Sequence, residues 1–173
     1  MQVKENWADI KKIFAQSFKS SFHYAVATVD EEGGPHVTPI GSLILGSPGR
    51  GFYFEELPRQ LPLYLQSNKQ VCVLAVNSSR WFWIKSLFSG RFSSPPAIRL
   101  FGTVGEAREA SEKEIKLWHH RVKKARNSKG FALMWRDMKR VRDIEFSKAE
   151  PVHIGEMTRN VWDGMVMSRE SVG

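Results

Sequence analysis

The sequence predicts one mainly β domain in which six antiparallel strands form a barrel or sandwich flanked by helices. Short runs of β-branched and aromatic residues alternate with turns rich in glycine and proline over residues 24–104. The run Val71–Val76 is apolar throughout, which is typical of a central strand. A chain of 173 residues can bury about 70% of its unfolded surface in a single core, so residues 1–173 are expected to form one domain.

An amphipathic helix and a β-hairpin are predicted first. Asn6 can cap a helix of about twelve residues whose apolar positions recur at three- and four-residue steps. These positions are Trp7, Ile10, Phe14 and Phe18. Tyr24–Val29 then forms a strand, and the turn at residues 30–34 leads into a return strand at residues 35–45. Because Pro39 has no N–H for a ladder bond, the return strand should be interrupted or bulged there.

A third strand, a short helix and a central strand follow. Gly51–Glu55 is an aromatic strand, and Pro62 stands in the first turn of a helix that ends near Asn68. Two side chains of this helix, Leu63 and Leu65, are expected to point inward. Val71–Val76 is the central strand, and Cys72 within it is expected to be an unreactive core residue.

The segment Ser78–Phe92 mixes aromatic and basic residues without a clear period, which indicates either a lid over a ligand or an interface arm. A fifth strand is expected at Ala97–Val104. Ser111–Glu114 has the pattern of a capping box, and it begins a helix with one apolar stripe. That stripe consists of Ile115, Trp118, Val122 and Ala125. A short helical piece through Trp135 and Met138 then precedes a sixth strand, predicted at Arg142–Phe146, which can continue to Ile154.

Positive charge is concentrated in one part of the chain. The formal net charge is +8, and residues 116–148 hold 11 of the 26 basic residues and 3 of the 18 acidic ones. Such a stretch could bind nucleic acid or another polyanion, form a solvated helix face, or line an anionic cofactor. Nucleic acid is not the expected partner, because no helix-turn-helix, zinc-finger or RNA-recognition pattern accompanies the charge.

Several protein classes are excluded. No apolar run approaches the ~18 residues of a membrane span, and residues 1–12 lack the apolar centre of a signal peptide, so a soluble cytoplasmic protein is expected. One cysteine cannot form a disulfide within the chain. His119 and His120 point about 100° apart on a helix and lack a third ligand, so no metal site is expected.

Four stretches occur in a recognisable order. They are Ala25–Val29 with its glycine turn, His36–Ile40, Gly51–Phe54 followed by Arg59-Gln60 and Leu65–Asn68, and Ile98–Gly102. In this order the chain resembles the pyridoxamine phosphate oxidase family over residues 10–154. The resemblance implies a six-stranded antiparallel split β-barrel with flanking helices, and a homodimer that binds FMN at its interface.

The resemblance also implies where FMN would bind. The flavin ring would lie against His36, Val37, Thr38 and Pro39. The phosphate would lie just after the third strand, near Phe54, Glu55, Arg59 and Gln60. Glu55 and Glu56 stand where the family often has threonine, and two carboxylates would repel a phosphate. Arg59 must then compensate, or the phosphate must shift towards Lys69, Arg80 or Lys85.

Further residues and the reaction follow from the same resemblance. Arg99 could stabilise the negative charge of reduced FMN, or simply face outward from its strand. Trp81, Phe82 and Trp83 could stack on a ring or form dimer contacts. The implied activity passes hydride or electrons between a reduced nicotinamide and an unidentified small-molecule acceptor. Since the flavin supplies the chemistry, no catalytic Ser/His/Asp set is expected.

Alternatives remain open. A deazaflavin or haem could occupy the same cleft. The family's arginine and histidine pair that grips pyridoxal phosphate has no clear counterpart in Val161–Gly164, so pyridoxamine phosphate oxidase activity itself is not expected. The rival hypothesis is a non-catalytic protein that binds a polyanion through residues 116–148, and its binding would weaken steeply with salt.

Overall fold

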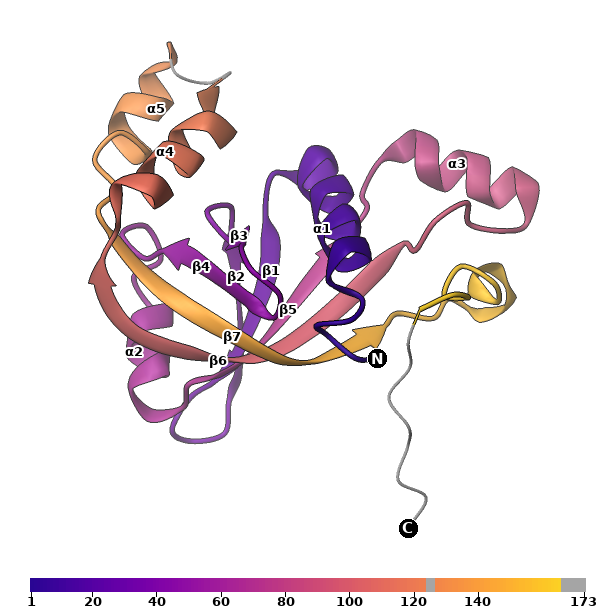
Figure 1. Ribbon diagram of the computed structural model, residues 1–173, viewed down its shortest axis with the longest axis horizontal. Helices are drawn as coiled ribbons and strands as arrows, with labels where there is room; N and C mark the ends of the chain where they lie inside the picture. The colour runs from indigo at the N-terminus through magenta and orange to yellow at the C-terminus, as the bar shows by residue number, and fades with distance from the viewer. Residues whose placement is uncertain (124–126, 166–173) are drawn as a thin grey trace.

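A computed structural model describes residues 1–123 and 127–165. Its helices and strands, in chain order, are α1 (Trp7–Ser21), β1 (Tyr24–Val29), β2 (Pro35–Ile40), β3 (Ile44–Leu45), β4 (Arg50–Phe54), α2 (Leu61–Ser67), β5 (Gln70–Val76), α3 (Arg80–Ser89), β6 (Ala97–Glu109), α4 (Glu112–Arg121), α5 (Lys129–Met134), β7 (Arg140–Pro151) and the 3₁₀ helix η2 (Gly155–Thr158). Figure 1 shows α1 against the curved sheet, α4 and α5 together at one side and α3 at the other.

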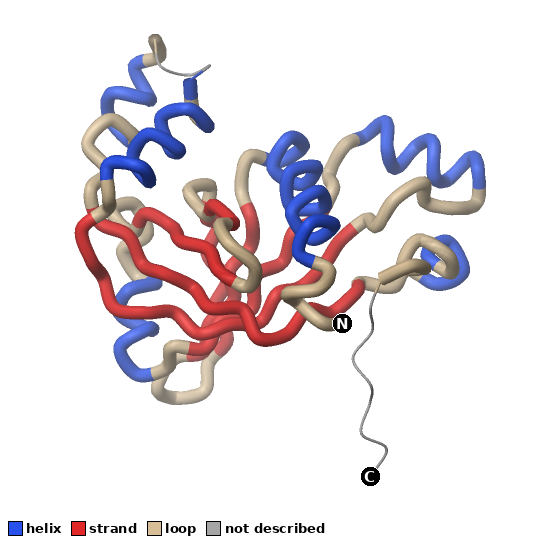
Figure 2. The backbone as a smooth tube through the Cα atoms, viewed as in Figure 1, coloured by secondary structure: helices blue, strands red, loops and turns tan. Residues whose placement is uncertain are grey.

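The strands form one antiparallel sheet in the order β2-β1-β5-β6-β7-β4-β3. Its two edge strands, β2 and β3, are consecutive in the chain and are joined only by residues 41–43. Because each Cα–Cα step spans at most ~3.8 Å, the two edges must lie within about 15 Å of each other. The sheet is therefore rolled into an incompletely closed barrel, as the strong curvature in Figure 2 shows.

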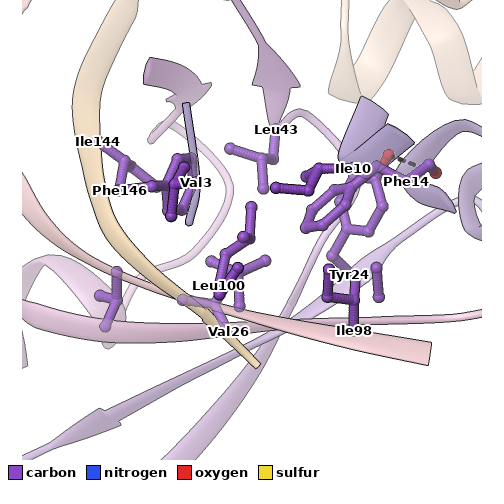
Figure 3. Close-up of a cluster of buried hydrophobic side chains, with 14 of the residues drawn as sticks. Val3, Ile10, Phe14, Tyr24, Val26, Leu43, Ile98, Leu100, Ile144 and Phe146 are labelled. Atoms are coloured by element: carbon purple, nitrogen blue, oxygen red, sulfur yellow. Dashed lines mark hydrogen bonds between the residues drawn. The ribbon is translucent and has the colours of Figure 1, made fainter. Parts of the chain in front are cut away.

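The barrel interior is the main hydrophobic core. Residues at alternate positions of the strands point inward and meet the apolar face of α1. Figure 3 shows this cluster, with Ile10 and Phe14 from α1 facing Val26, Ile98 and Leu100 from the sheet. A second core, which includes Phe54, Trp118 and Val141, lies under α4 and α5.

The prediction of six strands was wrong by one, because the return strand divides into β2 and β3. The break lies at Gly41–Leu43 and not at Pro39, which pairs with Ala25. Proline is tolerated at position 39 because β2 is an edge strand with no neighbour on its other side. The break falls where the chain passes close to α1, and a Cβ at Gly41 would lie 2.9 Å from the carbonyl oxygen of Phe22.

Three local predictions about side chains were wrong. Asn6 makes no side-chain cap of α1, and its Nδ2 instead donates to the Gln2 carbonyl at 2.7 Å. Leu63 is 54% exposed, because Leu61 and Leu65 form the buried face of α2. Cys72 lies half-buried on the outer face of β5, because successive strand residues alternate between the two faces.

The predictions for the C-terminal half identified the elements but not their lengths. β6 extends to Glu109, beyond its predicted end at Val104, whereas β7 ends at Pro151, within the continuation to Ile154 that the sequence allowed. The two strands pair along almost their whole length with two register shifts. One shift follows Phe101, where a Cβ at Gly102 would lie 2.5 Å from the Glu145 carbonyl oxygen. The predicted stripe on α4 is confirmed at Trp118 and Val122, whereas Ala125 lies outside the described residues. Within residues 1–123 and 127–165, no helix combines the length and apolarity needed to cross a membrane.

Candidate functional site

Two neighbouring hollows meet at the edge strand β2. The first, here called the aromatic cavity, has a volume of about 720 Å³ and is lined by Phe18, Phe22, His23, Thr38, Pro39, Ile40, Gly41, Ser42, Leu57, Pro58, Trp118, Arg121, Val122 and Trp135. The second, here called the Arg59 pocket, has a volume of about 330 Å³ and is lined by His36, Val37, Thr38, Pro39, Pro58, Arg59, Gln60, Leu61 and Tyr64. The two share Thr38, Pro39 and Pro58, so they lie side by side with these residues as their common wall.

The capping box of α4 fixes one wall of the aromatic cavity. Ser111 Oγ accepts from the backbone N–H of Glu114 at 3.3 Å, and Glu114 Oε2 accepts from the N–H of Ser111 at 2.8 Å. From this start, helical periodicity places Trp118 and Arg121 three residues apart on one face. Both side chains therefore line the cavity.

Among the described residues that line the aromatic cavity, Arg121 is the only arginine or lysine. Its guanidinium lies 3.7 Å above the ring of Phe18, and it donates to the Tyr24 hydroxyl at 2.9 Å and to the Leu43 carbonyl oxygen. Within residues 1–123 and 127–165 no carboxylate lies within 4.0 Å of Arg121. Burial lowers the pKa of Arg121, and Tyr24 opposes this shift. The cavity thus combines aromatic walls with one uncompensated positive charge.

The Arg59 pocket contains an ordered histidine. His36 Nε2 lies 2.7 Å from Asp30 Oδ2, and its ring stacks on Tyr64 at a centroid distance of 4.0 Å and an interplanar angle of 13°. The hydrogen bond from His36, followed by those from the Gly34 and Glu32 N–H groups, lowers the pKa of Asp30. Arg59 is exposed and forms no ion pair with a described residue, so its charge is available to a ligand.

Glu55 and Glu56, which were expected to repel a phosphate, line neither hollow and have partners elsewhere. Glu55 forms an ion pair with Arg142 and another with Arg140 at 3.3 Å. The Glu55 and Arg142 side chains are only 9% and 11% exposed. Glu56 accepts hydrogen bonds from the backbone N–H groups of residues 139 and 140. Glu55 is therefore paired with arginines of β7, and Glu56 is bonded to the backbone where β7 begins.

The structure brings together some of the site residues predicted from the sequence and separates others. His36, Val37, Thr38, Pro39, Arg59 and Gln60 line the Arg59 pocket. Phe54 does not line either hollow, because its side chain is fully buried against Trp118. Lys85 is on α3, which lies far from α2 in Figure 1 and contributes no residue to the Arg59 pocket. Arg99 is on the outer face of β6, where it lies 3.8 Å from Glu150.

The outer face of the sheet carries a row of small and apolar residues. Val37 pairs with Ala27, which pairs with Cys72, and Cys72 pairs with Phe101. In the next row Pro39, Ala25, Leu74 and Arg99 are paired in the same way. Paired residues point to the same side of a sheet. Val37, Pro39 and Arg99 therefore share a surface that is continuous with the rim of the Arg59 pocket.

The sequence analysis did not identify Arg121, Trp135 or Tyr64 as site residues. The spacing of Trp118 and Arg121 was visible, but Arg121 was counted only within the basic stretch. Three of its described cations are engaged separately, because Arg121 enters the cavity, Arg142 is held by Glu55, and Lys148 lies 2.6 Å from Glu150. Among the described basic residues of this stretch, Arg121 is the one that lines a candidate ligand site.

Comparison with known proteins relates this sequence to one protein family. Residues 11–151 match a family model described as pyridoxamine 5′-phosphate oxidase. No curated protein sequence gives a significant match.

Solved structures share the fold at low sequence identity. An FMN-binding protein from Syntrophomonas wolfei subsp. wolfei has 13% identity and a TM-score of 0.55, covering 88% of this chain and 95% of that one. HutZ from Vibrio cholerae, described as a haem storage protein, has 15% identity and a TM-score of 0.53, covering 87% and 95%. HupZ from Group A Streptococcus has 18% identity and a TM-score of 0.53, covering 82% and 92%.

Proposed function

Because this chain belongs to the pyridoxamine 5′-phosphate oxidase family, we propose that it is an FMN-binding flavoprotein and an oxidoreductase with a small-molecule substrate. The observation that carries the proposal is the juxtaposition of an unpaired cation, Arg59, with a large aromatic cavity across β2. An anionic tail and a planar ring are the two parts of FMN, and the site offers one hollow for each.

The residues present fit the cofactor. The Arg59 pocket offers a guanidinium, the amide of Gln60 and an imidazole, all of which can bind phosphate oxygens. Thr38 and Pro39 line both hollows, so a ring bound against β2 would stay connected to a phosphate at Arg59. Volumes of about 720 Å³ and 330 Å³ lie within the range of roughly 300–1,000 Å³ that is usual for ligand sites.

A homodimer is part of the proposal. The outer face of β1, β5 and β6 presents Ala25, Ala27, Cys72, Leu74 and Phe101, none of them fully buried in the single chain. This half-buried apolar surface is one that a partner chain would cover. Since Val37 and Pro39 belong to the same face, a partner seated there would lie against the flavin site.

The chain's own residues would bind and orient the reactants and exclude water. FMN, when bound, supplies hydride exchange with a reduced nicotinamide and with an acceptor. Trp118, Trp135 and Phe18 would cover the reacting faces, and Arg121 would attract an anionic group of the acceptor.

Haem binding is the second candidate. His23 lines the aromatic cavity, and its Nδ1 lies 2.8 Å from the Ser21 carbonyl oxygen, which leaves Nε2 for a metal. Arg59 and Arg121 could then receive the two propionates. The absorption spectrum separates the candidates, because bound haem and bound flavin absorb at different wavelengths.

The proposal is tested with Arg59→Ala and a matched variant, Lys123→Ala. Lys123 is also exposed and forms no ion pair with a described residue, but it lines neither hollow. FMN titration followed by flavin fluorescence should show a loss of one to two decades in affinity for Arg59→Ala, because a charge-assisted bond contributes ~1.5–3 kcal/mol. Lys123→Ala should bind like the wild type. Equal, small losses in both variants would contradict the assignment of the phosphate site.

A further inference from the structure

Helix α3 presents an apolar face that no described residue covers. This surface, here called the α3 face, consists of Trp81, Ile84, Leu87 and Phe88, whose side chains are 80%, 43%, 66% and 91% exposed. At about 100° per residue, these four positions fall within an arc of roughly 120° around the helix. Two large aromatic side chains are thus presented side by side to the surroundings, which is typical of a surface that binds something.

The opposite side of α3 is anchored to the rest of the chain. The ring of Phe92 contacts those of Phe82 and Trp83 at centroid distances of 5.4 and 5.2 Å. Trp83 Nε1 donates to the Asn77 carbonyl oxygen at 2.6 Å, and the N–H of Phe92 donates to the Met157 carbonyl oxygen at 3.0 Å. Figure 1 shows α3 projecting from one side of the body. The anchored side therefore fixes the α3 face outward.

The α3 face is separate from the candidate flavin site. No residue of α3 lines the aromatic cavity or the Arg59 pocket. Of the two roles expected for Ser78–Phe92, a lid over a ligand therefore has no support at these hollows. The remaining role is an arm that contacts a partner, and the chemistry around the α3 face indicates which kind.

The α3 face is bordered by basic residues. Arg80, Lys85 and Arg91 are exposed, and none of them forms an ion pair in the part of the chain that the structure describes. By helical position Arg80 lies within the apolar arc and Lys85 lies at its margin. Residues 57–105 contain no aspartate or glutamate. Aromatic and basic side chains therefore share one surface without a carboxylate on the same element.

The neighbouring elements do not cancel this charge. Lys19, near the end of α1, lines a hollow together with Arg80. On the other side, η2 carries Glu156, which forms an ion pair with Arg159. One further acidic residue, Asp163, follows within residues 157–165. Basic side chains therefore remain in excess around the α3 face.

We propose that the α3 face docks on an anionic lipid surface. Trp81 and Phe88 enter the boundary between headgroups and acyl chains, where aromatic rings are favoured, and the basic residues reach lipid phosphates with their long side chains. A helix of ten residues is about 15 Å long and cannot cross a hydrocarbon core of about 30 Å, so α3 lies in the plane of the surface.

Charge favours lipid over a second α3 face as the occupant. Two copies that met through this surface would bring their Arg80 and Lys85 side chains together, and like charges oppose such a contact. Phosphate groups of an anionic membrane neutralise the same cations, and each basic side chain near the surface strengthens binding. The docking does not depend on a bound flavin.

The proposal is tested by flotation with vesicles of phosphatidylcholine, with and without phosphatidylglycerol. The wild type should float with the anionic vesicles, bind pure phosphatidylcholine far more weakly, and lose affinity as salt is added. Trp81→Ser/Phe88→Ser should bind about a hundredfold more weakly, roughly tenfold for each large side chain withdrawn from lipid. Lys85→Gln/Arg91→Gln should lose about fivefold for each charge removed.

Leu133→Ser is the matched control, because Leu133 is 86% exposed but lies on α5. It should bind like the wild type. Trp81 and Phe88 belong to neither hydrophobic core, so their double variant should keep the wild-type melting temperature.

Insertion is measured separately with brominated lipids, which quench tryptophan fluorescence on contact. They should quench the wild type, and Trp81→Phe should float normally but lose most of the quenching. Equal quenching of both proteins would overturn the insertion of Trp81.

Two other results would overturn the docking as a whole. The first is that the wild type ignores the anionic vesicles, or that the double variant floats as the wild type does. The second is a wild-type dimer in light scattering that becomes a monomer in the double variant, because a second copy of the chain would then cover the α3 face. FMN titration is read independently, since α3 lines neither hollow. Loss of FMN binding in the wild type would refute the proposed function and leave the vesicle result standing.

Discussion

Replacing Arg121 with methionine should convert the aromatic cavity from one that selects anions into one that is merely apolar. Methionine keeps most of the side-chain length, so the Phe18 ring stays covered. The guanidinium has no carboxylate partner within 4.0 Å among the described residues, so its charge is free for a ligand. A hydrogen bond to a charged group contributes ~1.5–3 kcal/mol, which corresponds to roughly one to two decades in affinity.

The assay compares two dyes with the same aromatic body. Anilinonaphthalene sulfonate carries one negative charge, and phenylnaphthylamine carries none. Arg121→Met should weaken binding of the sulfonate by about tenfold to a hundredfold and leave binding of the neutral dye almost unchanged. Thermal unfolding of the same variant serves as the control, because Arg121 also donates to Tyr24 and to the Leu43 carbonyl. Equal losses for both dyes would mean that the cavity had collapsed, and no loss for either would refute the role of Arg121.

Two further predictions concern the framework that holds the site. The hydrogen bond from Arg108 lowers the pKa of Glu114 from 4.5 to about 2. A carboxyl group whose pKa is lowered by folding stabilises the folded protein at pH values above its unfolded pKa, so the melting temperature should fall as the pH decreases from 4.5 to 2. Glu114→Gln should remove this component of the pH dependence. Arg142→Met should reduce the free energy of unfolding, measured in urea, by ~3–5 kcal/mol, because it leaves the Glu55 carboxylate buried and without its closest partner. Adding Glu55→Gln should restore much of the lost stability. If the free-energy losses of the two single variants simply add in the double variant, the coupling is contradicted.

Local signals in the sequence predicted much of the fold. The bounds of β1 were predicted residue for residue, and both hydrogen bonds of the capping box at Ser111 were confirmed. The order of four short stretches indicated the family, and the match over residues 11–151 confirms it. Each of these features depends on residues close together in the chain.

Features that depend on distant contacts could not be predicted in this way. Glu55 is compensated by Arg142, 87 residues later, so the sequence left its charge apparently free beside the phosphate site. Helix α3 was not identified because its apolar residues lie on all sides of the helix, and their period is hidden. Arg121 joins the site only when α4 packs against the end of α1, a contact with no local signature.

The central claim is that the site on β2 binds FMN with its phosphate at Arg59. The most direct measurement is a titration of the purified, flavin-free protein with FMN and with FAD, followed by absorption and flavin fluorescence. The account predicts saturable binding with one FMN per chain, and weaker binding of FAD, because Arg59 is the one arginine or lysine among the described residues that line the Arg59 pocket and it serves a single terminal phosphate. Tighter binding of FAD, or no binding of either flavin, would contradict it.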